Sequence, residues 1–341
     1  MKMEYYTLFN QTRFLLYDYP GKNIFYFSFC LPMILILFIG NVIVIATVFT
    51  YNSLKKPTYL ILTSLAVTDL LTSVIAIPME IYRRTNVNDI TCSARWEVYL
   101  LGMTYICGFD SMLHMVMVTF DRYVAVVKPL RYNALVTKER IAIAVVIGWI
   151  ISVFSVIGQA VIYHSKETVP SAICVGIRYD PDIYSILLDL TIFVMTTTSG
   201  MTMIILNAVI LRTAIRQLRR IADVERALDN ATGGSESREE AARKMKACKV
   251  IICVVTAFII CHTPIGIMHL CFAVSDSVLL NGVMNEISFV LYLISSAVNP
   301  LIYCLVDRVF RECAWRMLSS RAVRLYQRDN GQTSDGVVSL A

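Results

Sequence analysis

The sequence predicts an all-α membrane protein, with a bundle of seven transmembrane helices followed by a short amphipathic helix. Its 341 residues are 57% hydrophobic and only 16% charged, whereas a soluble domain carries about 25% charged residues. Seven apolar runs each reach the roughly 20 residues that a helix needs to cross a bilayer. The sequence contains no segment with the alternating pattern of a membrane barrel strand, so helices are expected throughout.

The apolar runs divide the chain into four parts. We expect an outer N-terminal segment, the bundle, a membrane-surface helix and a polar tail, at residues 1–23, 24–306, 307–318 and 319–341. The predicted spans are 24–51, 58–82, 98–127, 140–163, 183–211, 247–273 and 284–306. One face of the surface helix collects apolar residues, a pattern typical of a helix lying on a leaflet. These residues are Val309, Phe310, Cys313, Met317 and Leu318.

Basic residues are divided unequally between the loops on the two sides. One set of loops holds 23 of the 31 Lys and Arg residues and comprises 51–57, 121–140, 212–249 and 307–341. Basic loops usually stay in the cytoplasm, so this set is predicted to be cytoplasmic and the N-terminus to lie outside. The net charge of +6 therefore reflects membrane topology and gives no support for nucleic-acid binding.

The predicted outer segments carry two signals for modification. Asn10 begins an Asn-Gln-Thr glycosylation acceptor. Of the ten cysteines, only Cys92 and Cys174 fall in outer loops, so we expect a disulfide between them. The first 24 residues lack the apolar core and cleavage site of a signal peptide, and no Cys/His cluster has the spacing of a metal site.

The third span ends on the charged tripeptide Asp121-Arg122-Tyr123. A carboxylate and a guanidinium at the edge of a membrane are costly unless they pair or reach water. The tripeptide alone is compatible with a functional site and with a pair of interfacial anchors.

Asp69 lies in the middle of the second span, where a carboxylate needs hydrogen-bond donors or a cation. If the helices close into one bundle, its expected neighbours are Asn41, Ser111, Ser295 and Asn299. Their oxygens suit Na⁺, because hard cations prefer oxygen ligands. A purely structural hydrogen-bond network is the alternative, and the spacing leaves both open.

The third span also contains Asp110 and His114, one helical turn apart. Residues at this spacing share a helix face, so the imidazole can partner the carboxyl group. The sequence leaves three roles open for Asp110, which are a hydrogen bond to another helix, a protonated buried state and contact with a ligand.

Together these features resemble the rhodopsin-like (class A) G-protein-coupled receptors over residues 24–318. The matching motifs are Gly40-Asn41, Leu65 to Asp69, Asp121-Arg122-Tyr123, Pro129-Leu130, Trp149, Phe258, Cys261 to Pro264, and Asn299 to Tyr303. The resemblance implies a plasma-membrane receptor that binds an extracellular ligand and activates a heterotrimeric G protein. Arrestin and a receptor kinase are its further implied partners, and Na⁺ is the only implied cofactor.

The resemblance also implies roles for individual residues. Arg122 would meet the G protein after the sixth span swings outward, and Asp121 would restrain it at rest. The relay along the seventh span would use Asn299, Pro300 and Tyr303. Asp69 and Ser111 would form a sodium pocket together with the neighbours named above, and Cys92–Cys174 would attach the second outer loop to the third span.

The ligand class is narrowed by departures from subfamily patterns. Amine receptors resemble one another in having an Asp at the position where this chain has Thr104. Opsins resemble one another in having a Lys in the seventh span, and the seventh span of this chain has no Lys. His262 stands where the family usually has Trp. We therefore expect a peptide or a small polar molecule. The candidate pocket residues are Glu80, Thr104, Gly108, His262, His269, Glu286 and Tyr292.

Two acids in that candidate pocket carry a further hypothesis. Glu80 and Glu286 are possible counter-ions for a cationic ligand group; the alternative is that such residues are solvated charges at the loop edges. For the whole chain, the alternative to a receptor is a transporter or channel, for which we expect internal repeats and find none. An enzyme is not expected, because no Gly-x-Ser-x-Gly elbow and no His/Glu metal pair is present.

Overall fold

The structure is a computed structural model that describes residues 21–86, 94–163, 183–229, 256–257, 259–271, 273–274 and 278–319. Within these ranges the chain is almost entirely helical and contains no strand. Helices are the expected solution for a membrane span, because every internal N–H and C=O bonds within its own segment.

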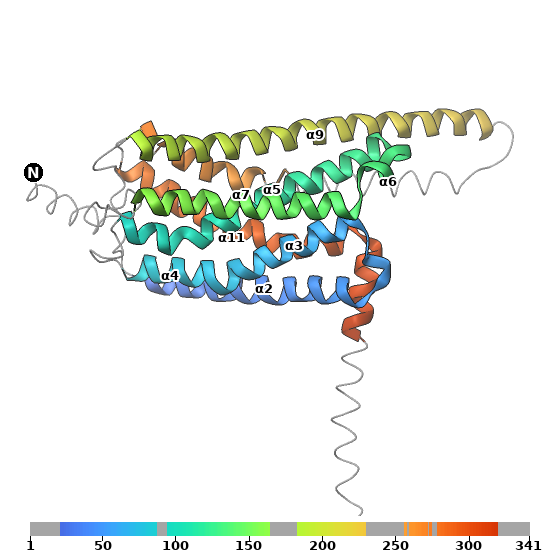
Figure 1. Ribbon diagram of the computed structural model, residues 1–341. Coiled ribbons are helices and arrows are strands. Elements are labelled where there is room, and N and C mark those ends of the chain that lie inside the picture. The colour runs from blue at the N-terminus through green and yellow to red at the C-terminus, as the bar shows by residue number, and fades with distance from the viewer. Residues whose placement is uncertain are drawn as a thin grey trace, which may run out of the picture.

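The long helical segments of the described residues lie side by side along one axis (Figure 1). They are α2 (Lys22–Thr50), α3 with η2 and α4 (Pro57–Leu71, Thr72–Ala76 and Ile77–Thr85), α5 (Ala94–Val127), α7 (Lys138–Tyr163), α9 (Ile183–Asp229), the segment Ile259–Cys271, and α11 (Val278–Val306). Five of them are long and apolar enough by themselves to cross a membrane: α2, α3–α4, α5, α7 and α9. Short elements connect them at one end, namely η1 (Asn52–Leu54), η3 (Pro129–Arg131) and α6 (Tyr132–Leu135).

The helix α5 is the central element of the bundle. It contacts α3, α4, α7 and α9, so its side chains face four helices at once. Burial of Asp110, His114 and Asp121 on this helix follows from that position. Charged groups on α5 therefore need partners on neighbouring helices rather than water.

The second span is interrupted by a π-helical turn, η2. Pro78 lies in the first turn of the following helix, α4. Proline lacks an N–H and its ring crowds the carbonyl four residues earlier, which explains an extra residue per turn just before it. The turn changes the rotation of α4, and Glu80, Arg83 and Arg84 all become buried.

The first and last spans approach closely at Gly40. A Cβ atom built on Gly40 would lie 3.0 Å from Cγ of Pro300 and 3.1 Å from its Cβ. The ring of Pro300 is rigid, so the absence of a side chain at Gly40 is what lets α2 and α11 pack here. Asn41, next in sequence, is fully buried at the same level.

A helix of residues 308–319 follows α11 and runs across the end of the bundle (Figure 1). Asp307 caps it, because its Oδ1 accepts a hydrogen bond from the backbone N–H of Phe310 at 3.1 Å. The phenol of Tyr59 donates to the other oxygen of Asp307 at 2.6 Å. The cap thereby attaches the new helix to the start of α3.

One face of helix 308–319 is buried against the bundle. Its buried apolar residues are Phe310, Cys313, Ala314 and Met317, at the i, i+3, i+4, i+7 spacing of one helical stripe. Val309 and Leu318, which belong to the predicted leaflet face, lie beside this stripe and are 45% and 43% exposed. The Cys313 sulfur is 3.6 Å from the Ser53 hydroxyl and faces protein.

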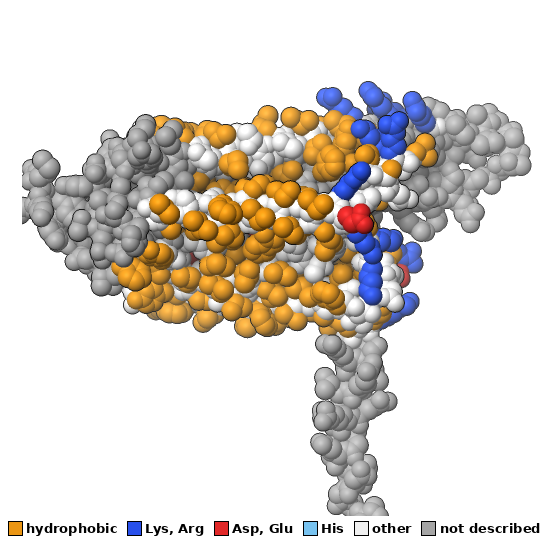
Figure 2. Space-filling view, in the orientation of Figure 1, with side chains coloured by type: hydrophobic (Ala, Val, Ile, Leu, Met, Phe, Trp, Pro, Cys, Tyr) orange, Lys and Arg blue, Asp and Glu red, His pale blue; other side chains and the backbone are white. Residues whose placement is uncertain are grey.

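The surface matches a molecule surrounded by lipid. Figure 2 shows hydrophobic side chains covering most of the face in view, with Lys and Arg side chains gathered at the end where α6 and helix 308–319 lie. Many large apolar side chains are well exposed, such as Ile24 at 73%, Phe49 at 72% and Phe154 at 66%. Such exposure is unusual for a soluble monomer.

The helices extend beyond several predicted spans. The helix α9 continues to Asp229, although the apolar run ends near residue 211, because its charged extension keeps a helix-compatible composition. The helix α11 begins at Val278 and α5 at Ala94. Predictions for Asn10, Cys92, Cys174, Phe258, the start of the sixth span at 247–255 and the tail from 320 lie outside the described residues.

Candidate functional site

A cavity opens between the helices in the half of the bundle that contains Glu80. The empty space in and above it is about 650 Å³, a volume that includes open solvent at the mouth. It is lined by α4, α5, α9, the segment Ile259–Cys271 and α11. Apolar and aromatic side chains form most of the wall, among them Tyr105, Phe109, Met268, Phe289 and Tyr292.

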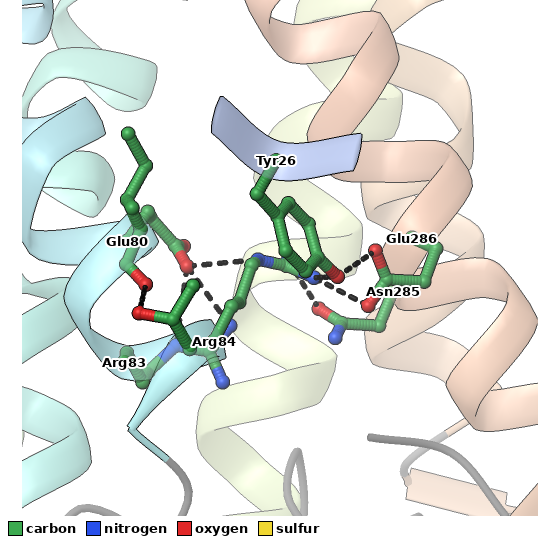
Figure 3. Close-up of polar contacts among 8 residues, drawn as sticks. Tyr26, Glu80, Arg83, Arg84, Asn285 and Glu286 are labelled. Atoms are coloured by element: carbon green, nitrogen blue, oxygen red, sulfur yellow. Dashed lines mark hydrogen bonds and ion pairs between the residues drawn. The ribbon is translucent and has the colours of Figure 1, made fainter. Parts of the chain in front are cut away.

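Arg84 crosses one side of this cavity and joins three helices (Figure 3). Its Nε donates to Glu80 at 3.1 Å, and its Nη1 pairs with Glu286 at 2.5 Å. The phenol of Tyr26 donates to the same Glu286 at 2.7 Å. Arg83 also pairs with Glu80, at 2.9 Å. Two guanidiniums and two carboxylates thus form one cluster between α2, α4 and α11.

The Arg84 guanidinium is also packed against aromatic rings. Its central carbon lies 4.2 Å from the ring centroid of Phe289 and 5.7 Å from that of Tyr26. Cation–π contact of this kind adds to ion pairing when the charge is removed from water. Arginines of the protein already hold both carboxylates, so Glu80 or Glu286 could pair with a cationic ligand only by sharing or losing one of these contacts.

The opposite side of the cavity has one further acid–base pair. Nδ1 of His269 lies 2.9 Å from Oδ1 of Asp189, and both side chains are buried. His269 lines the cavity and Asp189 does not, so the imidazole stands between the carboxylate and the open space. His262 lines the cavity too and is 4% exposed.

A second polar site lies deeper, around the fully buried Asp69. The Asn299 amide donates to its Oδ2 at 3.0 Å, as expected from the sequence. Ser296 also lies beside this carboxyl group. The hydroxyl of Ser295, the predicted neighbour, donates instead to the Tyr292 carbonyl of its own helix at 2.7 Å, because the turn of α11 points it away.

Three buried oxygens of the predicted sodium-site residues have no hydrogen-bond partner among the described residues. They are Oδ1 of Asp69, Oδ1 of Asn41 and Oγ of Ser111. Uncompensated oxygens in a membrane interior are costly, and together they suit a hard cation. The residues present thus fit the Na⁺ that the family resemblance implies.

A chain of hydrogen bonds near Asp110 connects the helices α3, α5 and α7. The indole of Trp149 donates to the Ser64 hydroxyl at 3.0 Å, and that oxygen lies 2.8 Å from Nε2 of His114. Nδ1 of His114 is 3.2 Å from Oδ2 of Asp110, to which the Thr68 hydroxyl also donates. A proton on Nδ1 lets every group in this chain donate or accept consistently.

At the opposite end of α5, Arg122 is held by the acid beside it. Its Nη2 pairs with Oδ2 of Asp121 at 2.6 Å and contacts the Thr58 hydroxyl at 3.2 Å. The phenol of Tyr132, in α6, donates to Oδ1 of Asp121 at 2.7 Å. The Asp121 side chain is buried, whereas that of Arg122 is 34% exposed, so the guanidinium can leave without unfolding the helix.

Tyr132 remains a donor over the ordinary pH range. Burial of the phenol raises its pKa above the usual value, and the hydrogen bond to Asp121 acts in the same direction. Tyr123, third in the tripeptide, instead stacks on Phe120 with ring centroids 6.1 Å apart. The side chain of Tyr303 lies outside the described set, although its backbone is helical.

The structure brings most of the predicted ligand residues to one cavity and reveals several that were missed. Six of the seven candidates line it, namely Glu80, Thr104, Gly108, His262, His269 and Tyr292; Glu286 lies behind, on Arg84. The missed lining residues include Arg84, Asn285 and Ser288. Arg84 follows the predicted end of the second span at residue 82, so the sequence places it in a loop, whereas the helix continues to Thr85.

Known proteins similar to this chain are receptors. The alpha-1A adrenergic receptor of Oryzias latipes is 28% identical over 330 residues, which cover 86% of this chain and 67% of that receptor. Neuromedin-U receptor 2 of Homo sapiens is 28% identical over 302 residues, covering 85% and 70%. The histamine H2 receptor of Homo sapiens is 28% identical over 316 residues, covering 89% and 80%.

The model of one protein family matches most of the chain. This family, described as 7 transmembrane receptor (rhodopsin family), matches residues 40–303. The match includes the cavity, the Asp69 site and the Arg122 network in one continuous region. Its members are receptors rather than enzymes, and the transporter alternative is not favoured. The chain belongs to the rhodopsin family of seven-transmembrane receptors.

Proposed function

We propose that this protein is a plasma-membrane receptor that binds an extracellular ligand in the Glu80 cavity and activates a heterotrimeric G protein at the Arg122 end. The N-terminus would lie outside and the C-terminus in the cytoplasm, as the distribution of basic residues predicts. The observation that carries the proposal is the Asp121–Arg122 pair, in which a buried acid restrains a partly exposed guanidinium.

The cavity and the Arg122 network lie toward opposite ends of the same central helix, α5. A ligand can favour the active arrangement only by binding it more tightly than the resting one. Release of Arg122 from Asp121 would expose a cation to a G protein, and later to arrestin and a receptor kinase. Na⁺ at Asp69, Asn41 and Ser111 would neutralise the buried carboxylate and favour the resting bundle.

Nucleotide exchange tests the proposed switch without an identified ligand. Full-length receptor in nanodiscs is mixed with a panel of purified G-protein heterotrimers, and uptake of a non-hydrolysable GTP analogue is measured. Asp121→Asn removes the restraint and should raise basal exchange roughly tenfold, within the usual range of coupling between sites. Adding Arg122→Ala to that variant should return exchange to the receptor-free rate.

Lys56→Ala serves as the control, because Lys56 is an exposed cation at the same end of the bundle. It should leave exchange unchanged. If the Asp121→Asn variant stimulates no heterotrimer, or if exchange survives the loss of Arg122, coupling through this residue is disproved.

A further inference from the structure

We propose that the cavity takes an uncharged, predominantly apolar ligand whose polar group is bound by the hydroxyls of Thr104 and Ser288. This inference rests on the proposed receptor function and names the chemical class of its ligand. It departs from the cationic ligand that the acids near the cavity first suggested.

The first argument is charge balance at the cavity wall. Among the described residues that line the cavity, Glu80 is the only acid and Arg84 the only arginine or lysine. Glu80 accepts hydrogen bonds from Arg83 and Arg84, and Glu286 pairs with Arg84. These four groups are formally neutral as a set, and Asp189 is covered by His269.

A charged ligand would therefore disturb bonds that already exist. An ammonium placed on Glu80 would also face two guanidiniums, and a carboxylate placed on Arg84 would face two acids. Either would have to displace a buried ion pair, whose broken partner would remain without water. An uncharged group avoids both costs.

The second argument is the pair of hydroxyls that line the cavity. The Oγ1 of Thr104 on α5 and the Oγ of Ser288 on α11 are buried, and neither has a hydrogen-bond partner among the described residues. Ser288 is only 4% exposed, so water reaches it poorly. A buried hydroxyl without a partner costs free energy, and a neutral amide, ester or alcohol can supply the missing bond.

The third argument is the apolar wall. Phe109, Met112, Ile192 and Met268 line the cavity beside aromatic rings, and burial of apolar surface against them would provide most of the binding free energy. Polar groups at such sites usually fix orientation rather than affinity. The ligand is thus expected to have a large apolar body and few polar atoms.

A library of matched compounds tests this assignment. Each apolar body, in a graded series of sizes, is made as a primary amide, an amine and a carboxylate. Binding to full-length receptor in nanodiscs is measured by saturation-transfer NMR. The bound compounds should be amides, with the charged members of each triad at least about tenfold weaker.

Three variants connect the result to the cavity. Thr104→Val and Ser288→Ala should each weaken the bound amides several-fold. The control Thr198→Val, an exposed threonine on α9, should not. Arg84→Gln leaves the cluster with an excess negative charge, and it should shift the preference within a triad from the amide to the amine.

The assignment is overturned if amines or carboxylates bind wild-type receptor as well as the amides do, if no amide binds, or if the hydroxyl variants bind amides normally. Each outcome is separate from the test of the proposed function. The Asp121→Asn, Arg122→Ala receptor should retain the amide preference while it fails to stimulate nucleotide exchange.

Discussion

The imidazole of His114 is the residue on which the polar interior between α3, α5 and α7 depends. Its Nε2 accepts from Ser64, and its Nδ1 donates to the Asp110 backbone carbonyl at 2.7 Å and lies 3.2 Å from Oδ2 of the same residue. Both His114 and Asp110 are fully buried. Oδ1 of Asp110 has no hydrogen-bond partner among the described side chains, so this carboxyl group depends strongly on the contacts at Oδ2.

Replacing His114 should therefore destabilise the receptor more than its size suggests. His114→Phe preserves most of the volume but removes the imidazole beside the Asp110 carboxyl group, which keeps only the Thr68 hydroxyl as a donor, at a cost of about 1–3 kcal/mol. The melting temperature of purified receptor should fall clearly. The double variant His114→Phe, Asp110→Leu removes both partners and should recover part of the loss. Equal melting of the His114→Phe variant and wild type would contradict this.

At this scale the sequence predicted contacts within a helix well. The Asp110–His114 pair was expected because residues four apart share a face. Asp69 and Asn299 were expected to meet because each is polar at the same depth of the membrane. The Ser64–Trp149 link and the choice between Ser295 and Ser296 depend on how two helices are rotated about their axes, which apolar periodicity does not define.

At the scale of elements, the contact between α2 and α11 is set by a missing side chain. Gly40 lies against the rigid ring of Pro300, and Asn41 and Asn299 are buried at the same level. The lateral position of these helices thus determines how the oxygens around Asp69 converge.

Gly40→Ala tests this packing. The new methyl group would lie 3.0 Å from Cγ of Pro300, which forces the helices apart at a cost of about 1–3 kcal/mol. The melting temperature should fall. Gly158→Ala is a matched control, because a Cβ atom there meets nothing within 4 Å, and its melting temperature should stay constant or rise. Similar behaviour of the two variants would argue against the close approach.

Helix ends were the elements that the sequence predicted least well. The second span was predicted to stop near residue 82, but α4 continues to Thr85 because Arg83 and Arg84 find partners inside the protein. Charged residues usually mark the end of an apolar run. The sequence does not reveal that Glu80 and Glu286 pair with these arginines, and so it does not predict the longer helix. For the same reason, Arg84 is absent from the predicted ligand pocket.

At the scale of the whole molecule, the seven helices enclose two polar levels, the cavity and the Asp69 site. The hydroxyl of Tyr292, one of the tyrosines that line the cavity, lies 3.2 Å from the Thr72 hydroxyl between these levels. A change in the packing of α11 would therefore alter both levels together. This is the kind of shared element through which two sites can bias one equilibrium.

Sodium should stabilise the resting molecule by binding at the Asp69 site. The melting temperature should rise when NaCl replaces choline chloride at the same ionic strength, by the equivalent of about 1 kcal/mol when Na⁺ is about fivefold above its Kd. Asp69→Asn should abolish this difference and Ser111→Ala should weaken it. Ser295→Ala should preserve it, since that hydroxyl bonds within its own helix; loss of the sodium effect in this control would contradict the assigned ligands.

The thiol of Cys313 points into protein, beside the Ser53 hydroxyl, and is only 8% exposed. Enzymes that add fatty acyl chains need an accessible sulfur, so acylation of Cys313 would first require helix 308–319 to move away from the bundle. The contacts of Phe310, Met317 and the Asp307 cap oppose that movement.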